Sequence, residues 1–442
     1  MQENKMGVMP IPKLVISMSL PIMISLLIQS LYNIVDSIFV ARISEEALSA
    51  TSIAYSAQML QIAVAVGTSV GMNAVVSRYL GAKQYDKANA SATMGLFLNM
   101  LSSLIFVVWG IFGTKAFISL FTNDTSIIEM GTSYLRICQL FCTGIFLSTY
   151  AQRLLQSTGR TFSSMMAHIC GAVTNLILDP ILIFGLFHFP VMGISGAAIA
   201  TVIGQWVAAI AGLLFNKIQN KDIHLTFHGF WNWDTIRSIY KVGAPTILTQ
   251  SFGSIMIACM NMILATFSTT AVAFFGVYFK LQSFLFMPMN GLGQGSLPII
   301  GFNYGAKNKN RILETCKVSM TLGICIGLVG TLIFMVFPKT LLSLFAAGQQ
   351  MIQIGVPALR IISCTFVLAS FTMITGYILS GLGNGMVNMI ACAIRQIVIL
   401  LPCVYLIGQM ENLSLIWFAF WISEAIAFVF ALYSLKKGLK KM

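Results

Sequence analysis

Long apolar segments, separated by short polar or Gly- and Pro-containing stretches, recur along the whole chain. A membrane-spanning helix needs about 20 consecutive, mostly apolar residues, and each of these segments reaches that length. The pattern therefore predicts twelve transmembrane helices, at residues 14–42, 47–76, 90–112, 132–156, 162–186, 193–216, 239–267, 271–300, 315–337, 352–379, 386–408 and 413–435.

The composition places these segments in a membrane rather than in a soluble core. Hydrophobic residues make up 57% of the 442 residues, and charged residues only 9%. A soluble globular protein carries roughly a quarter charged residues, so this chain has too few to cover a surface in water. We therefore predict an all-α polytopic membrane protein.

The basic residues indicate how the chain is oriented. If the N-terminus is cytoplasmic, 19 of the 26 Lys and Arg residues fall in cytoplasmic loops and tails, and five fall outside. Cytoplasmic loops of membrane proteins carry an excess of Lys and Arg, so both termini are predicted to be cytoplasmic. The net charge of +13 is spread over many loops without interleaved aromatic residues, which favours membrane lipids over nucleic acid as partners.

Cysteine and histidine give no sign of a metal centre or an enzyme. The nine cysteines are odd in number, fall mostly in apolar runs and form no Cys-x-x-Cys motif. We interpret them as small, buried, reduced hydrophobic residues. No His-rich or paired-Asp metal motif is present that would favour a polytopic membrane enzyme, so we expect no enzymatic activity and no cofactor.

Similar short motifs recur at a nearly constant spacing, which indicates an internal duplication. The segment "LLIQS" at 26–30 resembles "ILTQS" at 247–251. The segment "YLGAK" at 79–83 resembles "NYGAK" at 303–307. In both cases the second copy follows the first by almost the same distance along the chain, about half of its length.

The longest polar connection divides the predicted helices into two groups of six. We predict an N-lobe at 1–216 with helices one to six, a cytoplasmic connecting loop at 217–238, and a C-lobe at 239–442 with helices seven to twelve. An even number of helices in each half gives both copies the same orientation, as in transporters with parallel repeats. Such a chain has its natural binding cavity between the halves, which favours a carrier that works by alternating access over a channel.

Three acidic residues, Asp36, Asp179 and Glu424, lie well inside predicted spans. A carboxylate in the apolar part of a bilayer costs a few kcal/mol even on lenient scales, so it must face protein or a water-filled cavity. A carboxyl group that can gain or lose a proton suits proton coupling, and a carboxylate with oxygen neighbours suits Na⁺. These residues are therefore candidates for ion coupling.

The acids of the first half have polar neighbours at helical spacing. Tyr32 lies four residues before Asp36, and Asn175 lies four residues before Asp179, so each pair shares a helix face. Pro180 follows Asp179 directly and disfavours helical geometry there. We predict a kink at this point that frees a carbonyl group near the carboxylate.

Two further residues complete the candidate site. Thr201 offers a hydroxyl group in "GAAIATVIGQ", a segment of small residues that allows close helix packing, and Pro21 is a candidate bending point in the first span. At the repeat spacing Asp36 maps to Ile257, and "LDP" maps to "LPC" at 401–403. The first half alone therefore keeps both acids, which indicates a specialised cation site there.

Glu424 in the last span leaves two interpretations open. Lys280 and Arg395 are the only basic residues deep within predicted spans, and either of them could form a charge-compensating pair with Glu424. Alternatively, these three residues could form a charged site in the second half, with Glu424 binding a cation.

Seven motifs lie in order along the chain: "MSLPIMI" (18–24), "YNIVDSIFVAR" (32–42), "SRYLGAKQYDKA" (77–88), "LQSTGR" (155–160), "NLILDPILIFG" (175–185), "GISGAAIAT" (193–201) and "NYGAK" (303–307). "NLILDPILIFG" is the most specific of them. With these motifs the chain resembles the multidrug and toxic compound extrusion (MATE) family, and its bacterial multidrug-efflux branch in particular.

The resemblance implies two six-helix lobes around a central V-shaped cleft, and cation-coupled export of small amphipathic organic cations such as drugs and dyes. By position, the polar site that family members use for H⁺ or Na⁺ matches Asp36, Asn175, Asp179 and Thr201, with Tyr32 beside it. In the family, protonation of the matching first-helix Asp has been linked to bending of that helix, for which Pro21 is the hinge here. We expect a monomer in the bacterial cytoplasmic membrane.

A lipid-linked-sugar flippase of the same wider superfamily is the main alternative. Such a protein should line its cleft with basic residues that meet a pyrophosphate group. Only Lys280 and Arg395 are available for this deep within the spans, so the sequence favours the antiporter, with H⁺ and Na⁺ both open as the coupling ion.

Overall fold

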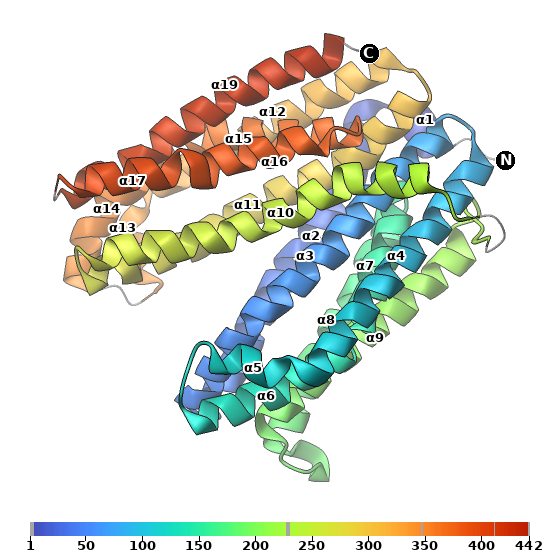
Figure 1. The fold of residues 1–442 in the computed structure, drawn as a ribbon. Coiled ribbons are helices and arrows are strands. Elements are labelled where there is room, and N and C mark those ends of the chain that lie inside the picture. The colour runs from blue at the N-terminus through green and yellow to red at the C-terminus, as the bar shows by residue number, and fades with distance from the viewer. Residues whose placement is uncertain (1–3, 227–229, 346–347, 411, 441–442) are drawn as a thin grey trace. The chain divides into compact units, whose positions relative to one another are not determined.

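The computed structural model describes residues 4–226, 230–345, 348–410 and 412–440, and these are helical with no strand among them (Figure 1). They form two compact units. The first comprises Met1–Lys5 and Ile24–Ile247, and the second comprises Met6–Met23 and Leu248–Met442.

Two long helices, α2 (Ile11–Ala41) and α10 (Trp233–Ala265), each belong partly to one unit and partly to the other. The first unit otherwise contains α3 (Glu45–Gly81), α4 (Tyr85–Phe112), α5 (Thr114–Ser119), α6 (Thr125–Leu140), α7 (Thr143–Ser157), α8 (Thr161–Phe184), the 3₁₀ turn η1 (Leu186–His188) and α9 (Gly193–Gln219).

The second unit contains the remaining helices, apart from the short α1 (Lys5–Val8), which begins in the first unit. They are α11 (Thr269–Gly305), α12 (Lys309–Val336), α13 (Pro338–Ser343), α14 (Gln349–Ser363), α15 (Phe366–Gly381), α16 (Gly385–Ala393), the π-helical turn η2 (Ile394–Val398), α17 (Leu400–Gly408), α18 (Leu413–Ile416) and α19 (Phe418–Lys440).

The helices are consistent with the twelve predicted spans. Among the described residues, ten helical segments are long and apolar enough to cross a membrane, or eleven if the bent pair α14 and α15, which meet at 49°, counts as one span. The predicted span 132–156 is divided into α6 and α7 at Phe141 and Cys142. The chain is thus a multi-pass membrane protein, and twelve spans are consistent with this structure.

The internal duplication predicted from the motifs is confirmed by the helix bounds. The helices α11 and α12 repeat the lengths of α3 and α4, and both follow their counterparts at the spacing that separates "YLGAK" from "NYGAK". Ser44 and Ser268 cap the matching helices, because each side chain accepts a hydrogen bond from the backbone N–H three residues on. Lys83 and Lys307, which follow these helices, both take the left-handed conformation, with φ of 58° and 56°.

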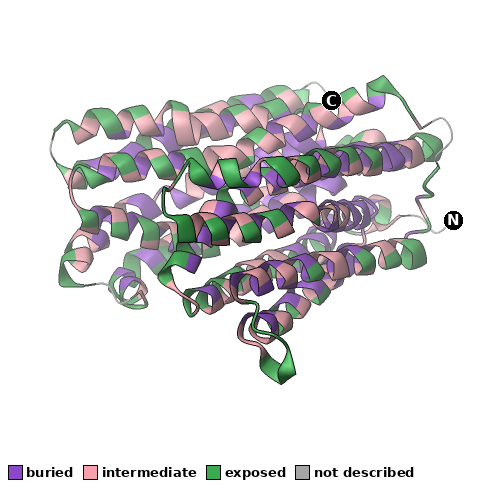
Figure 2. Cartoon of the chain, turned by 60° about the horizontal axis from the view of Figure 1, so that its bottom comes forward, coloured by how far each residue is buried: buried purple, intermediate pink, exposed green. Residues whose placement is uncertain are grey.

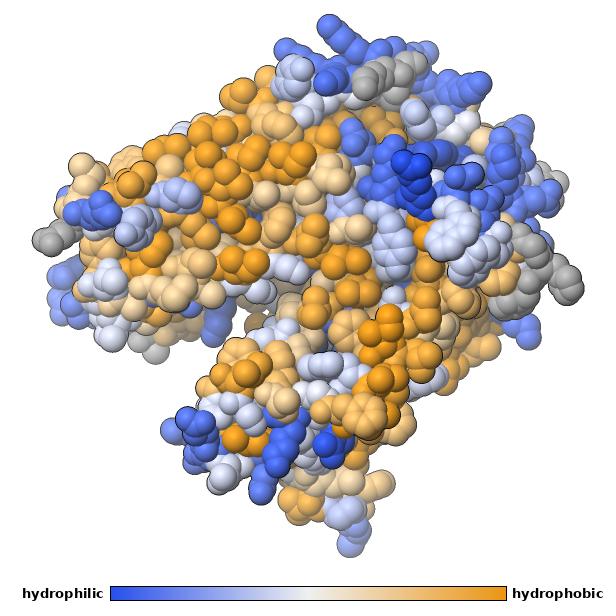
Figure 3. Space-filling model, in the orientation of Figure 1, coloured by the Kyte–Doolittle hydropathy of each residue, from blue (hydrophilic) through white to orange (hydrophobic). Residues whose placement is uncertain are grey.

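The lipid-facing surface is carried by large apolar side chains. Ile105 on α4 and Val429 on α19 are 63% and 64% exposed, and exposed residues run along the outer sides of the helices in Figure 2. In Figure 3 hydrophobic residues cover the sides of the helices, and many hydrophilic residues gather near the helix ends. Contiguous apolar surface of this kind is expected where a protein meets lipid rather than water.

Two prolines mark the places where the chain passes between the units. Pro21 lies in α2, two residues before the last residue of that helix assigned to the second unit, Met23. Pro245 lies in α10, two residues before Ile247, the last residue of that helix assigned to the first unit. The spacing between the two prolines equals that between α3 and α11, so this feature is shared by both repeats.

The domain boundaries expected from the sequence, 1–216, 217–238 and 239–442, stay predictions, and so does the central cleft.

Candidate functional site

The first unit brings Asp36 of α2 together with Asp179 of α8. Asp179 is fully buried and Asp36 is half-buried, and the two carboxyl groups lie close enough to interact electrostatically. Two ionised carboxylates repel each other when they are this close, so a proton or another cation bound between them stabilises the pair. The pair can therefore hold a proton, and losing it would leave two buried negative charges side by side.

Asn175 orients the Asp179 carboxyl group. Its Nδ2 donates a hydrogen bond to Asp179 Oδ1 over 3.2 Å, across one turn of α8. Three other oxygen atoms at this site, Asp36 Oδ1, Asp179 Oδ2 and Asn175 Oδ1, are buried without a hydrogen-bond partner. Free acceptor oxygens of this kind fit either a proton or a hard cation such as Na⁺.

No basic side chain among the described residues neutralises this pair. In the part of the chain that the structure describes, neither Asp36 nor Asp179 forms an ion pair with Lys or Arg. The described residues also contain no group of three or more His, Cys, Asp or Glu that could bind a metal ion. A Na⁺ ion here would therefore need amide or hydroxyl oxygens in addition to the two carboxylates.

The other residues predicted for the first-half site lie at different distances from the two carboxyl groups. Tyr32 on α2 lies near enough to interact electrostatically with Asp36 and Asp179. Thr201 on α9 is half-buried but forms no hydrogen bond to Asp36, Asp179 or Asn175 within the described residues. Pro180 does not end α8, which continues to Phe184.

The sequence reasoning missed three neighbours of the acid pair. Tyr134 on α6 is buried and lies near both carboxyl groups, and Cys138, one helical turn later, lies near Asp36. Gln58 on α3 lies close to both Tyr134 and Cys138. Gln58 could have been identified from the sequence, because it is a polar residue in the middle of the apolar segment 47–76.

Close contact between α8 and α9 fixes the position of Asn175. A Cβ atom on Gly204 would lie 2.8 Å from the Gly171 carbonyl oxygen and 3.0 Å from Asn175 Cβ. A Cβ atom on Gly171 would lie 2.6 Å from the Gly204 carbonyl oxygen. Glycine at both positions lets the two backbones approach closely, as small residues do at helix interfaces in membranes.

Replacing Gly204 with Ala should therefore destabilise the first unit, because the added methyl group meets backbone atoms that cannot turn away. We expect a loss of about 1–3 kcal/mol, the usual cost of overpacking, measured as a lower unfolding temperature in detergent. Gly276→Ala is the matched control, since a Cβ atom there has nothing within 4 Å. An equal unfolding temperature for both variants would contradict this account of the interface.

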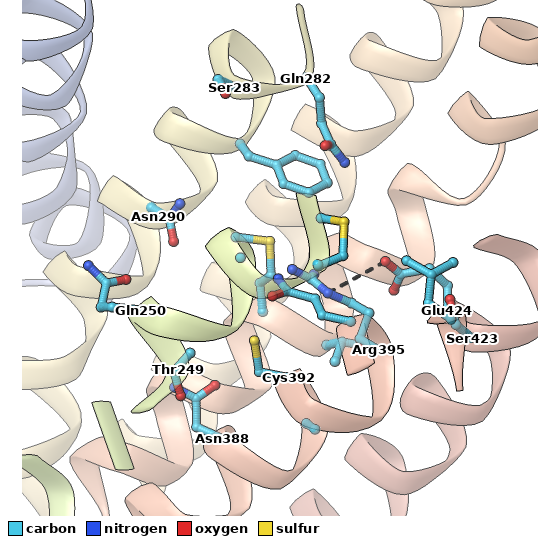
Figure 4. A pocket seen from close by; sticks show the side chains of 18 of the residues that line it. Thr249, Gln250, Gln282, Ser283, Asn290, Asn388, Cys392, Arg395, Ser423 and Glu424 are labelled. Atoms are coloured by element: carbon cyan, nitrogen blue, oxygen red, sulfur yellow. Dashed lines mark ion pairs between the residues drawn. The ribbon is translucent and has the colours of Figure 1, made fainter. Parts of the chain in front are cut away.

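The second unit contains a cavity of about 330 Å³ with the Glu424 carboxylate and the Arg395 guanidinium in its lining. Arg395 Nε and Glu424 Oε1 are 3.6 Å apart and form an ion pair (Figure 4). Lys280 is exposed and does not line this cavity. Of the two basic residues considered as partners for Glu424, the structure thus pairs it with Arg395.

The sequence of this chain is similar to one family of proteins along most of its length. The profile of the MatE family matches residues 21–181 and 245–406. A curated relative, the "Multidrug export protein MepA" of Staphylococcus haemolyticus (strain JCSC1435), is 25% identical over 433 residues, which cover 97% of this chain and 94% of that protein. The protein of the same name from Staphylococcus aureus (strain NCTC 8325 / PS 47) is 24% identical over 440 residues, which cover 97% and 95%.

Solved structures show the same fold. A MATE protein in complex with MaL6 matches with a TM-score of 0.92 and 22% identity over the full length of both chains. A transporter of the MOP superfamily from Pyrococcus furiosus, described as having reverse polarity of its binding pocket, matches with the same score and identity over 100% of this chain and 98% of the other. Because the family profile covers more than half of the residues, in both repeats, this chain belongs to the MatE family, whose members are transporters and not enzymes.

Proposed function

We propose that this protein is a multidrug antiporter that exports amphipathic organic cations in exchange for H⁺ or Na⁺. Its curated relatives are named as multidrug export proteins, which supports drugs as the class of substrate. The single observation that carries the coupling is the Asp36–Asp179 pair: a buried and a half-buried carboxyl group lie close together and form no ion pair with a basic residue among those described. Such a pair can take up or release a cation without breaking a salt bridge.

Cation exchange at this pair would bias the protein between two states. With a cation bound, α2 and α8 can stay close, since the excess negative charge is compensated. When the cation leaves, the two carboxylates repel each other, and a state in which they separate or meet water becomes more favourable. An ion that binds one state better than the other shifts the population by the difference in binding free energy.

The prolines near the unit boundaries are our candidate hinges for this change. Pro21 separates the part of α2 that carries Asp36 from the part that belongs to the second unit. Proline removes one backbone hydrogen bond from the helix interior and so lowers the cost of bending there. We propose that α2 bends near Pro21 during alternating access, and that Pro245 has the matching role in α10.

We also propose where the protein is located and how its chain is oriented in the membrane. We place the protein in the cytoplasmic membrane of a bacterium with both termini in the cytoplasm, acting as a monomer in contact with lipid. The flippase alternative loses support, because Lys280 is exposed away from the second-unit cavity and the charge of Arg395 is already paired with Glu424.

Transport into proteoliposomes tests this function directly. Purified protein would be reconstituted with a cationic dye on one side and an excess of H⁺ or of Na⁺ on the other. We expect the dye to be driven against its own gradient by one of the two ion gradients, and not in liposomes without protein. Dye movement that is equally fast with and without an ion gradient would contradict coupled antiport.

A further inference from the structure

The cavity of the second unit is built around a charged pair that is not fully satisfied. The Arg395 and Glu424 side chains are only 13% and 8% exposed. One atom of each forms the ion pair, but Arg395 Nη1 and Glu424 Oε2 are buried without a hydrogen-bond partner. A buried polar group that lacks a partner costs about 1–3 kcal/mol, and more when it is charged. Among the described residues, the ion pair therefore leaves one donor of Arg395 and one acceptor of Glu424 unsatisfied.

The backbone around Arg395 holds this side chain at the cavity. Arg395 lies in the π-helical turn η2, where the N–H of Ile399 bonds to the carbonyl oxygen of Ile394 over 3.2 Å. Turns of this type within α-helices are rare and frequently lie at functional sites. The guanidinium group also lies over the ring of Phe286, 5.8 Å from its centre, and a cation in this position is attracted to the ring.

The walls of the cavity suit a flat organic molecule with polar groups. Figure 4 shows amide and hydroxyl side chains from several helices around the charged pair. Among the lining residues, Gln396 has a side-chain oxygen that is a further buried acceptor without a partner. Methionine and aromatic side chains line the rest of the cavity, and both adapt well to apolar ligands. These apolar residues are Met256, Met287, Met373, Phe279, Phe286 and Phe420.

The charges decide which ligand fits. A cation alone would have to compete with Arg395 for Glu424, and an anion alone would have to compete with Glu424 for Arg395. A ligand with one charge would separate Arg395 from Glu424 and bind only one of them. The other side chain would then be a buried charge without a partner, which costs several kcal/mol. A ligand that carries both charges avoids this cost, because each of its groups meets the side chain of opposite charge.

We propose that the second-unit cavity binds an aromatic zwitterion, with its carboxylate on Arg395 and its cationic nitrogen on Glu424. This site lies within one unit and is separate from the Asp36–Asp179 pair. Binding there requires no ion gradient, so its test does not depend on whether the proposed coupling is correct.

Three dyes on one xanthene skeleton test the ligand class. The first is a rhodamine with a free carboxylate, which is a zwitterion; the second is its methyl ester, which is a cation; and the third is fluorescein, which is an anion at neutral pH. Binding to purified protein in detergent would be measured by fluorescence anisotropy. We expect the zwitterion to bind at least about tenfold more tightly than either of the others, a difference of about 1.4 kcal/mol.

Variants of the charged pair should change this selectivity in opposite directions. Arg395→Gln should weaken binding of the zwitterion about tenfold and strengthen binding of the ester, because Glu424 is then released. Glu424→Gln should weaken the zwitterion and favour fluorescein. Arg360→Gln, at an exposed position of the same unit outside the cavity, should leave all three affinities unchanged.

The double variant Arg395→Gln/Glu424→Gln keeps the test decisive if a single variant does not fold. It removes both charges together and so leaves neither of them uncompensated. We expect it to bind all three dyes with similar affinity. Retention of the preference for the zwitterion in either the double variant or Arg395→Gln would overturn the proposal, as would the absence of that preference in the wild-type protein.

Discussion

Asp179→Asn is expected to abolish ion-driven export of dyes while the protein stays folded. Asparagine keeps an Oδ1 atom that can accept the hydrogen bond now donated by Asn175 Nδ2, but it cannot exchange a proton or supply a charge to Na⁺. Pumping a dye against a tenfold gradient needs about 1.4 kcal/mol from the coupling ion. In reconstituted vesicles the variant should therefore let the dye equilibrate without accumulating it.

Asp36→Asn should have the same effect, and the double variant should be no worse than either single one. Residues that act as one unit are strongly non-additive, and the electrostatic interaction between the two carboxyl groups makes them one unit. Glu129→Gln, an exposed acidic position on α6, is the matched control and should transport normally. Wild-type accumulation by Asp179→Asn at equal expression would refute the coupling role.

The spans and the duplication could be predicted from the sequence because both depend on local, repeated signals. A bilayer imposes a minimum apolar length, and the repeated motifs set the spacing that reappears in α3 and α11.

The breaks within spans were harder to predict. The turn η2 in the span 386–408 ends at Val398, four residues before Pro402. Proline clashes with the carbonyl group four residues earlier, so Pro402 is tolerated in the first turn of the new helix α17.

The site could be predicted only as far as single helices determine it. The spacing of Asn175 and Asp179 on α8 gave a pair that the structure joins by a hydrogen bond. The neighbours that come from other helices depend on tertiary packing, which explains why Tyr134 and Gln58 were missed. The same limit applies to Glu424, whose partner could be named from the sequence only as Lys280 or Arg395.

A contrast between the two units follows from their charges. In the first unit two acids face each other without a basic partner among the described residues, so an exchangeable cation can compensate them. In the second unit Glu424 already has a cation, Arg395, that is part of the chain and cannot dissociate. Ion exchange is therefore expected at the first-unit site alone, whereas the fixed pair in the second unit contributes to stability and to ligand selection.

Arg395→Met is expected to destabilise the protein by about 3–5 kcal/mol, the usual cost of leaving one member of a buried ion pair without its partner. Methionine fills a similar volume but supplies no charge to Glu424, which is buried. The unfolding temperature in detergent should fall, and the double variant Arg395→Met/Glu424→Gln should recover most of the loss. Lys280→Met is the control for removing a positive charge from a span, and its effect should be small because Lys280 is exposed. If Arg395→Met and Lys280→Met unfold at the same temperature, the ion pair does not stabilise the second unit.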